Sequence, residues 1–136
     1  MISFDTKVRV RYGETDKMGF VYYGIYPLYY EIGRTELIRS FGLTYSYLEE
    51  NGILMPVYSC NLRYIKAAIY DELLTIRTML KELPGVRIKF DYEIFNENGA
   101  LINTGDAVLL FIDNQKRKPR KAPEILLELL RPHFEN

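Results

Sequence analysis

The chain has 136 residues, 48% of them hydrophobic and 26% charged, so it is long enough to bury one core and too short for two ordinary domains. Its 18 basic residues balance its 18 acidic ones, which argues against the positively charged surface with which proteins grip long stretches of nucleic acid. One cysteine and one histidine exclude an internal disulfide, a Cys/His zinc site and a CxxC redox pair within one chain.

The first predicted elements are a strand and a long helix. Apolar or β-branched side chains alternate with charged ones near the start of the chain, which predicts a strand with one dry face bearing Phe4, Thr6, Val8, Val10 and Tyr12. From about 24 to 41 apolar residues recur at helical spacing, which predicts a helix buried nearly all round at its start. Pro27 suits the first turn of this helix, and Gly42 suits its C-terminal cap.

A short helix over 45–50 is expected next, followed by closely spaced strands. Their alternating patterns cover 58–64, 74–81, 86–94 and about 101–112. In the first of these strands the apolar side carries Tyr58, Cys60, Leu62 and Tyr64, and we expect Cys60 to be an inert core thiol.

Turns between these strands indicate how they pair. Leu83-Pro84-Gly85 marks one turn, and Asn98-Gly99 is typical of a two-residue hairpin. Consecutive hairpins indicate an antiparallel sheet with one buried face, and a last amphipathic helix is expected over 124–133. The pattern predicts an α+β architecture, in which a sheet of about five strands wraps around the long helix.

The chain shows no internal repeat and no linker, so we expect one domain over 1–136. Its first residues lack the features of a secretory signal, and no stretch approaches the roughly 18 apolar residues of a membrane span. We therefore expect a soluble, cytoplasmic protein.

The connection between the first strand and the long helix, 11–24, holds the candidate chemistry. The start of a buried helix leaves N–H groups without partners, so the amides of Tyr23 and Gly24 could hold the oxygen of a polarised carbonyl. Asp16 lies on a loop that must return to this helix start, and its carboxylate could attack that carbonyl or activate water. The alternative is that Asp16 and Thr15 only cap a turn.

Two segments, 13–26 (Gly-Glu-Thr-Asp-Lys-Met-Gly-Phe-Val-Tyr-Tyr-Gly-Ile-Tyr) and 29–34 (Tyr-Tyr-Glu-Ile-Gly-Arg), resemble the signature of a known family. It comprises the hotdog-fold acyl-CoA thioesterases of the 4-hydroxybenzoyl-CoA thioesterase type, including YbgC-like proteins. The resemblance extends through 56–61 and Asp71 and weakly into 117–123. It implies a hotdog fold and hydrolysis of an acyl-CoA thioester to free acid and CoA, without a cofactor or metal.

The resemblance also implies roles for individual residues. Asp16 matches the catalytic carboxylate of the family, and the amide of Tyr23, beside Gly24, matches the group that polarises the thioester carbonyl. Among the tyrosines of the helix start we expect Tyr22 and Tyr26 to touch substrate, although such tyrosines more often fill a core or a subunit contact.

Glu31 stands on the central helix, where the family often has an acid, and could orient a water or a polar group of the substrate. The alternative is a helical partnership with Arg34 or Thr35.

Two positions depart from the family pattern, because many members carry histidine at Tyr23 and asparagine at Ile25. The backbone amide survives any side chain, and a thiol of pKa about 8.5 leaves as a thiolate without a strong acid. Ile25 nevertheless favours an alternative, a non-catalytic acyl-CoA or lipid-binding hotdog protein. A hotdog dehydratase would need a histidine proton shuttle, which the chain does not offer near this helix.

A basic run follows the last predicted strand, with five positive charges in six positions over 116–121. We expect Arg117, Lys118 and Arg120 to bind the phosphates of coenzyme A, whereas the alternative is a solvated turn. The family hides its sheet edges by pairing two sheets, with each active site built from both subunits. We therefore expect a homodimer or homotetramer whose small-molecule partner is an acyl-CoA.

Overall fold

The computed structural model describes residues 1–135 and is built on a five-stranded antiparallel sheet in the order β1-β4-β5-β6-β3. The strands are β1 (Ile2–Arg9), β3 (Val57–Tyr64), β4 (Leu73–Leu80), β5 (Arg87–Phe95) and β6 (Leu101–Leu110). A second, small sheet joins β2 (Ile53–Leu54), β7 (Ile112–Asp113) and β8 (Lys118–Pro119). The expected α+β class and the expected number of main strands are confirmed.

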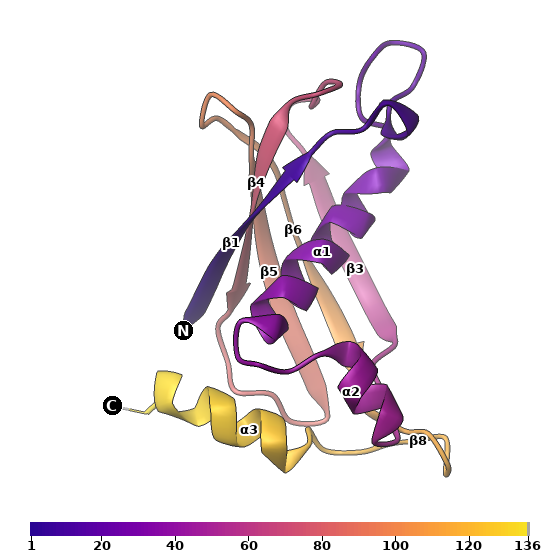
Figure 1. The fold of residues 1–136 in the computed structure, drawn as a ribbon, viewed down its shortest axis with the longest axis vertical. Helices are drawn as coiled ribbons and strands as arrows, with labels where there is room; N and C mark the ends of the chain where they lie inside the picture. The colour runs from indigo at the N-terminus through magenta and orange to yellow at the C-terminus, as the bar shows by residue number, and fades with distance from the viewer. Residues whose placement is uncertain (136) are drawn as a thin grey trace.

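The long helix α1 (Tyr26–Arg39) lies across one face of the sheet, as Figure 1 shows, and a 3-10 turn at Tyr23–Ile25 leads into it. Pro27 occupies its first turn as expected. The cap at its end is Ser40 rather than the predicted Gly42, which lies two residues further on, with a φ of +83°. The short α2 (Tyr45–Glu50) has the predicted bounds, and α3 (Glu124–Leu130) is followed by a 3-10 turn at Arg131–His133.

The helix lies close to the sheet at Gly33. A Cβ atom there would collide with Oγ1 of Thr78 and lie 3.0 Å from Cγ2 of Ile76, both on β4. One turn earlier, Tyr30 stacks on Tyr92 of β5 with ring centroids 4.0 Å apart. The core therefore lies between α1 and the inner faces of β4, β5 and β6, and it fixes where the start of α1 sits.

Three details of the sequence-based predictions are wrong. β1 ends at Arg9, and Tyr12 lies in a 3-10 turn with its side chain exposed, because the chain must turn toward α1 there. The turn after β5 spans residues 96–100 rather than two residues, because Oδ1 of Asn96 accepts N–H groups from Asn98 and Ala100. Cys60 is exposed, because β3 is an edge strand and lies at the opposite side of the sheet from β1 and β4, which α1 contacts most.

None of the helices among residues 1–135 combines the length and the apolar character that crossing a membrane requires.

Candidate active site

The connection from β1 to α1 folds back on itself beside the start of the helix. Short antiparallel bridges join Thr15 to Val21 and Phe20 to Ile69. The N–H of Val21 also donates to the carbonyl of Ala68 at 2.9 Å. These contacts tie the loop to the segment that follows β3, so that the loop lies at the end of the sheet where α1 begins (Figure 1).

Asp16 is half-buried in this loop, and its two carboxylate oxygens have different surroundings. Oδ1 accepts N–H groups from Met18 at 2.9 Å and from Phe20 at 3.2 Å. Oδ2 accepts no hydrogen bond from residues 1–135. The capping role predicted as the alternative is thus present, but it occupies only one oxygen and leaves the other available for chemistry.

Glu14 anchors the same loop to the helix, a role that the sequence-based predictions missed. Its Oε1 accepts the hydroxyl of Tyr29 and the backbone N–H of Arg11, each at 2.9 Å. Its carbonyl also accepts the N–H of Tyr22 at 2.9 Å. In the sequence, only the position of Glu14 two residues before Asp16 could have suggested that it anchors the loop. Its partner, the hydroxyl of Tyr29, belongs to a residue 15 positions further along the chain.

The amides at the helix start remain available. Within the described residues, the N–H groups of Tyr23 and Gly24 donate to no acceptor, whereas the next amide, Ile25, donates to the carbonyl of Tyr22 at 2.9 Å. Free N–H groups at the start of a long helix, reinforced by its macrodipole, suit an oxygen that carries negative charge. A side chain at Gly24 would crowd the ring of Tyr22, since its Cβ would lie 2.9 Å from Cε2.

A pocket of about 340 Å³ brings the main candidates together, since Asp16, Tyr23 and Tyr26 all line it. Most of the other side chains that line this pocket are apolar. Tyr64 and Lys66 are the polar residues among them. Tyr26 is buried, and burial raises the pKa of its hydroxyl, so the group stays neutral at physiological pH. The hydroxyl accepts the N–H of Ala68 at 3.3 Å, which fixes its position in the pocket wall.

Two other predicted residues lie outside this lining. Tyr22 is exposed, and its ring packs against that of Tyr23 with centroids 4.7 Å apart. Glu31 is exposed on α1 and forms no ion pair with Arg34 among the described residues. Arg34 is instead buried and donates to the hydroxyl of Tyr92 at 3.4 Å, so Glu31 acts on it only as a nearby charge and not as a direct partner.

The basic run forms the hairpin between β7 and β8, at the opposite end of the molecule from the start of α1 (Figure 1). Arg117 has a positive φ of 53° in this turn, and Oδ1 of Asp113 accepts the N–H groups of Gln115 and Lys116. Within one chain, Arg117, Lys118 and Arg120 are therefore not brought together with Asp16.

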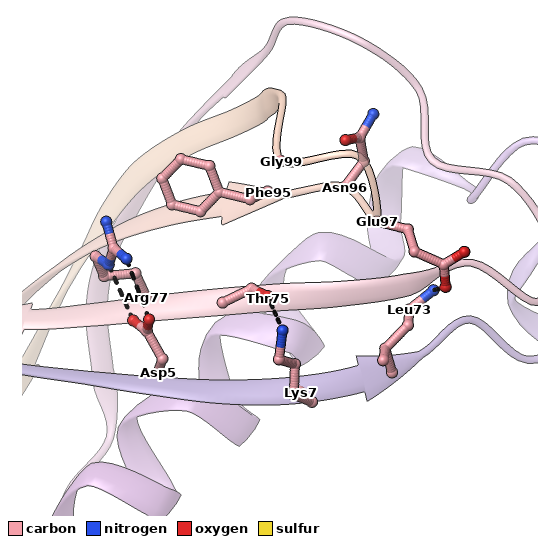
Figure 2. A pocket seen from close by; sticks show the side chains of 9 residues that line it. All are labelled: Asp5, Lys7, Leu73, Thr75, Arg77, Phe95, Asn96, Glu97 and Gly99. Atoms are coloured by element: carbon pink, nitrogen blue, oxygen red, sulfur yellow. Dashed lines mark hydrogen bonds and ion pairs between the residues drawn. The ribbon is translucent and has the colours of Figure 1, made fainter.

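A larger hollow of about 520 Å³ lies on the outer face of β1, β4 and β5, and Figure 2 shows its side chains. Its charged side chains already have partners: Arg77 binds Asp5 at 2.9 Å, and Lys7 donates to the hydroxyl of Thr75 at 2.8 Å. Glu97 accepts the N–H of Leu73 at 3.1 Å. Because these polar groups already have partners, the smaller pocket at Asp16 is the better candidate. No group of three or more His, Cys, Asp or Glu side chains within 1–135 is arranged to hold a metal ion.

Residues 10–130 match the model of the thioesterase-like superfamily. Over 124 residues the chain is 30% identical to the acyl-CoA thioester hydrolase YbgC of Escherichia coli O157:H7, covering 91% of this chain and 92% of that protein. It resembles the crystal structure of DHNA-CoA thioesterase from Staphylococcus aureus with a TM-score of 0.91 and 32% identity, over 100% of this chain and 97% of that one.

A third comparison concerns an aspartate-to-asparagine variant of 4-hydroxybenzoyl-CoA thioesterase, whose X-ray structure contains 4-hydroxybenzoyl-CoA. The TM-score is 0.81 at 25% identity, covering 93% of this chain and 97% of that one. Together with the sheet that wraps around α1, these similarities define a hotdog-fold thioesterase. The chain belongs to the thioesterase-like superfamily and is an enzyme of the thioester hydrolase class, which confirms the family resemblance in the sequence.

Proposed function

We propose that the protein hydrolyses acyl-CoA thioesters to a free acid and coenzyme A, with Asp16 as the catalytic carboxylate. One observation carries the proposal. Within residues 1–135, Oδ2 of Asp16 accepts no hydrogen bond and the amide of Tyr23 has no acceptor, and both residues line the same mostly apolar pocket. The names of the relatives support the substrate class, since YbgC of Escherichia coli is an acyl-CoA thioester hydrolase.

The chemistry requires a negative charge near the carbonyl carbon and donors near its oxygen. In one route Oδ2 of Asp16 attacks the carbonyl carbon, the C–S bond breaks, and water then hydrolyses the resulting anhydride. In the other route Asp16 takes a proton from water, and the water oxygen attacks. In both routes the amides of Tyr23 and Gly24 stabilise the developing oxyanion, and the coenzyme A thiolate leaves without a strong acid.

The remaining candidate residues have supporting roles in this proposal. Tyr26, in the pocket wall, would contact the acyl group, and Tyr22 would contact substrate at the rim. Glu31 is exposed on α1 and lies outside the pocket lining, so its role in orienting water or a polar group of the substrate stays a prediction.

We also propose that the enzyme is a homodimer or homotetramer. β3 pairs with β6 on one side only, and its other edge is exposed together with the side chains of Val57, Tyr58 and Tyr64. The Val57 end of β3 adjoins the small sheet that holds the basic hairpin, and the Tyr64 end adjoins Tyr23. Antiparallel pairing of two β3 edges would therefore bring the basic hairpin of one subunit toward the Asp16 pocket of the other.

This arrangement explains how the predicted coenzyme A contacts could form. The phosphates of a substrate bound in one subunit's pocket would lie near Arg117, Lys118 and Arg120 of the second subunit. Light scattering coupled to size exclusion should give a mass of two or four chains at micromolar concentration. A monomer mass would contradict both the assembly and the shared site.

The test of the proposed catalysis is Asp16→Asn. The asparagine Oδ1 can keep the bonds from Met18 and Phe20, while a neutral amide replaces the free oxygen. We expect an unchanged fold and oligomeric state and a kcat lower by at least about a hundredfold, measured as thiol release from short, long and aromatic acyl-CoAs.

Affinity for a non-hydrolysable acyl-CoA analogue should change much less than kcat. A variant that retains more than half of the wild-type rate would show that Asp16 is only a loop cap. A wild-type protein that binds the analogue and hydrolyses none of the substrates would instead favour the non-catalytic binding protein.

A further inference from the structure

Tyr64, the last residue of β3, reaches the start of the central helix. Its hydroxyl donates a hydrogen bond to the carbonyl oxygen of Tyr23 at 3.0 Å, across 41 positions of the sequence. Tyr64 also lines the pocket that contains Asp16. The proposed hydrolysis leaves this hydroxyl without a role, although it contacts the peptide unit next to the reacting carbonyl.

Packing holds the ring of Tyr64 in place even though half of the residue is exposed. The ring meets that of Tyr26 edge to face, with centroids 5.4 Å apart, and Tyr26 is buried. Partial burial, with smaller effects of Cys60 and Tyr23, raises the pKa of the Tyr64 hydroxyl. The phenol therefore keeps the proton that it donates to Tyr23.

The acceptor of this bond belongs to the peptide unit whose other end is the N–H of Gly24. A donor bound to a carbonyl oxygen draws electron density from the amide nitrogen, so the N–H of the same unit becomes a better donor. The preceding peptide unit has the same arrangement, because the carbonyl of Tyr22 accepts the N–H of Ile25 at 2.9 Å. Both units thus have a bound carbonyl and an N–H with no acceptor in the described chain.

We propose that Tyr64 is a positioning residue, which orients and polarises the Gly24 N–H that stabilises the oxyanion. The inference rests on the proposed function, because it requires an oxyanion at the start of α1. Negative charge on that oxygen is larger in the transition state than in the bound thioester, so the hydroxyl contributes mainly to kcat.

The matched variants are Tyr64→Phe, which removes only the hydroxyl, and Tyr70→Phe as its control. Tyr70 is exposed to a similar extent, and its hydroxyl makes no hydrogen bond to residues 1–135. Loss of a whole oxyanion donor lowers kcat by about 100- to 1000-fold, and Tyr64 acts only through such a donor. We therefore expect kcat to fall about three- to tenfold in Tyr64→Phe with KM within about twofold, and no change in Tyr70→Phe.

A spectroscopic readout separates polarisation from loop stability. In the Asp16→Asn background, the infrared stretch of a ¹³C-labelled thioester carbonyl should lie at lower frequency when bound than in water. Adding Tyr64→Phe should move this band back toward its position in water, whereas adding Tyr70→Phe should not move it. Melting temperatures of all variants, measured at one protein concentration, check that each remains folded.

Either a kcat within twofold of wild type or an unmoved carbonyl band in Tyr64→Phe overturns the inference. An equal loss in Tyr70→Phe also overturns it, because the effect would then not depend on the bond to Tyr23. A wild-type protein without thioesterase activity would refute the proposed function itself. The assay of the wild-type protein distinguishes that outcome from a failure of the inference alone. Without thioesterase activity, Tyr64 also has no catalytic role to play.

Discussion

The hydrogen bond between Tyr29 and Glu14 fastens the Asp16 loop to the central helix, and Tyr29→Phe removes it while keeping the ring. Tyr29 is fully buried, and its hydroxyl lies 2.9 Å from Oε1 of Glu14. Hydrogen bonds to charged groups contribute about 1.5–3 kcal/mol. Glu14 is only half-buried and keeps its bond from the N–H of Arg11, so the loss should fall near the lower end, about 1.5–2 kcal/mol.

A loss of this size should lower the melting temperature by about 3–8 °C for a chain of this length. Calorimetry at one fixed protein concentration measures it, because melting of an oligomer depends on concentration. Tyr12→Phe is the matched control, since Tyr12 is 79% exposed and its hydroxyl makes no hydrogen bond within residues 1–135.

The same variant has a local consequence. The N–H groups of Met18 and Phe20, which bind Oδ1 of Asp16, should exchange with solvent faster in Tyr29→Phe than in wild type. If Tyr29→Phe melts within 1 °C of Tyr12→Phe and these amides exchange at the wild-type rate, the bond to Glu14 does not anchor the loop.

Two further predictions concern substrate binding and pH. Reversing two charges of the basic hairpin, Arg117→Glu with Lys118→Glu, should raise KM for acyl-CoA with little change in kcat, because the lost contacts bind the substrate and the transition state equally. An unchanged KM would identify the hairpin as a solvated turn. Burial raises the pKa of Tyr45 to about 12 and also raises the pKa values of Tyr29, Tyr30 and Tyr92. Each of these phenols ionises more readily in the unfolded chain than in the folded one. The free energy of unfolding therefore keeps their full contribution below pH 10 and falls above it. Each tyrosine lowers it by up to about 1.4 kcal/mol per pH unit. Urea midpoints at pH 8, 9, 10 and 11 should show a loss that begins near pH 10, and a constant midpoint to pH 11 would contradict this reasoning.

Much of the architecture could be predicted from the sequence because its causes are local. The alternation over 86–94 and the helical spacing after Gly24 place apolar side chains on one face of a single element, whatever that element packs against. The candidate loop could be located for the same reason, since acid, glycine and aromatic residues gather directly before a buried helix start. Its family resemblance then singled out Asp16.

The alternation over 58–64 misled the prediction for Cys60, although the strand itself exists. A repeat of two tells which side chains share a face, but it does not tell whether another element covers that face. β3 lies at the edge of the sheet farthest from β1, and α1 makes most of its contacts with β1 and β4, so Cys60 is exposed in the single chain.

Only the tertiary structure decided which groups meet at the site. The bond from Tyr64 to Tyr23 and the bond from Tyr29 to Glu14 join residues 41 and 15 positions apart, and no local pattern encodes either distance. The separation of the basic hairpin from Asp16 likewise follows from the antiparallel pairing, because β1 and β6 run in opposite directions and finish at opposite ends of the sheet. Periodicity is a property of neighbouring residues and is already present in the sequence, whereas these contacts exist only once the sheet has closed around the helix and brought distant segments together.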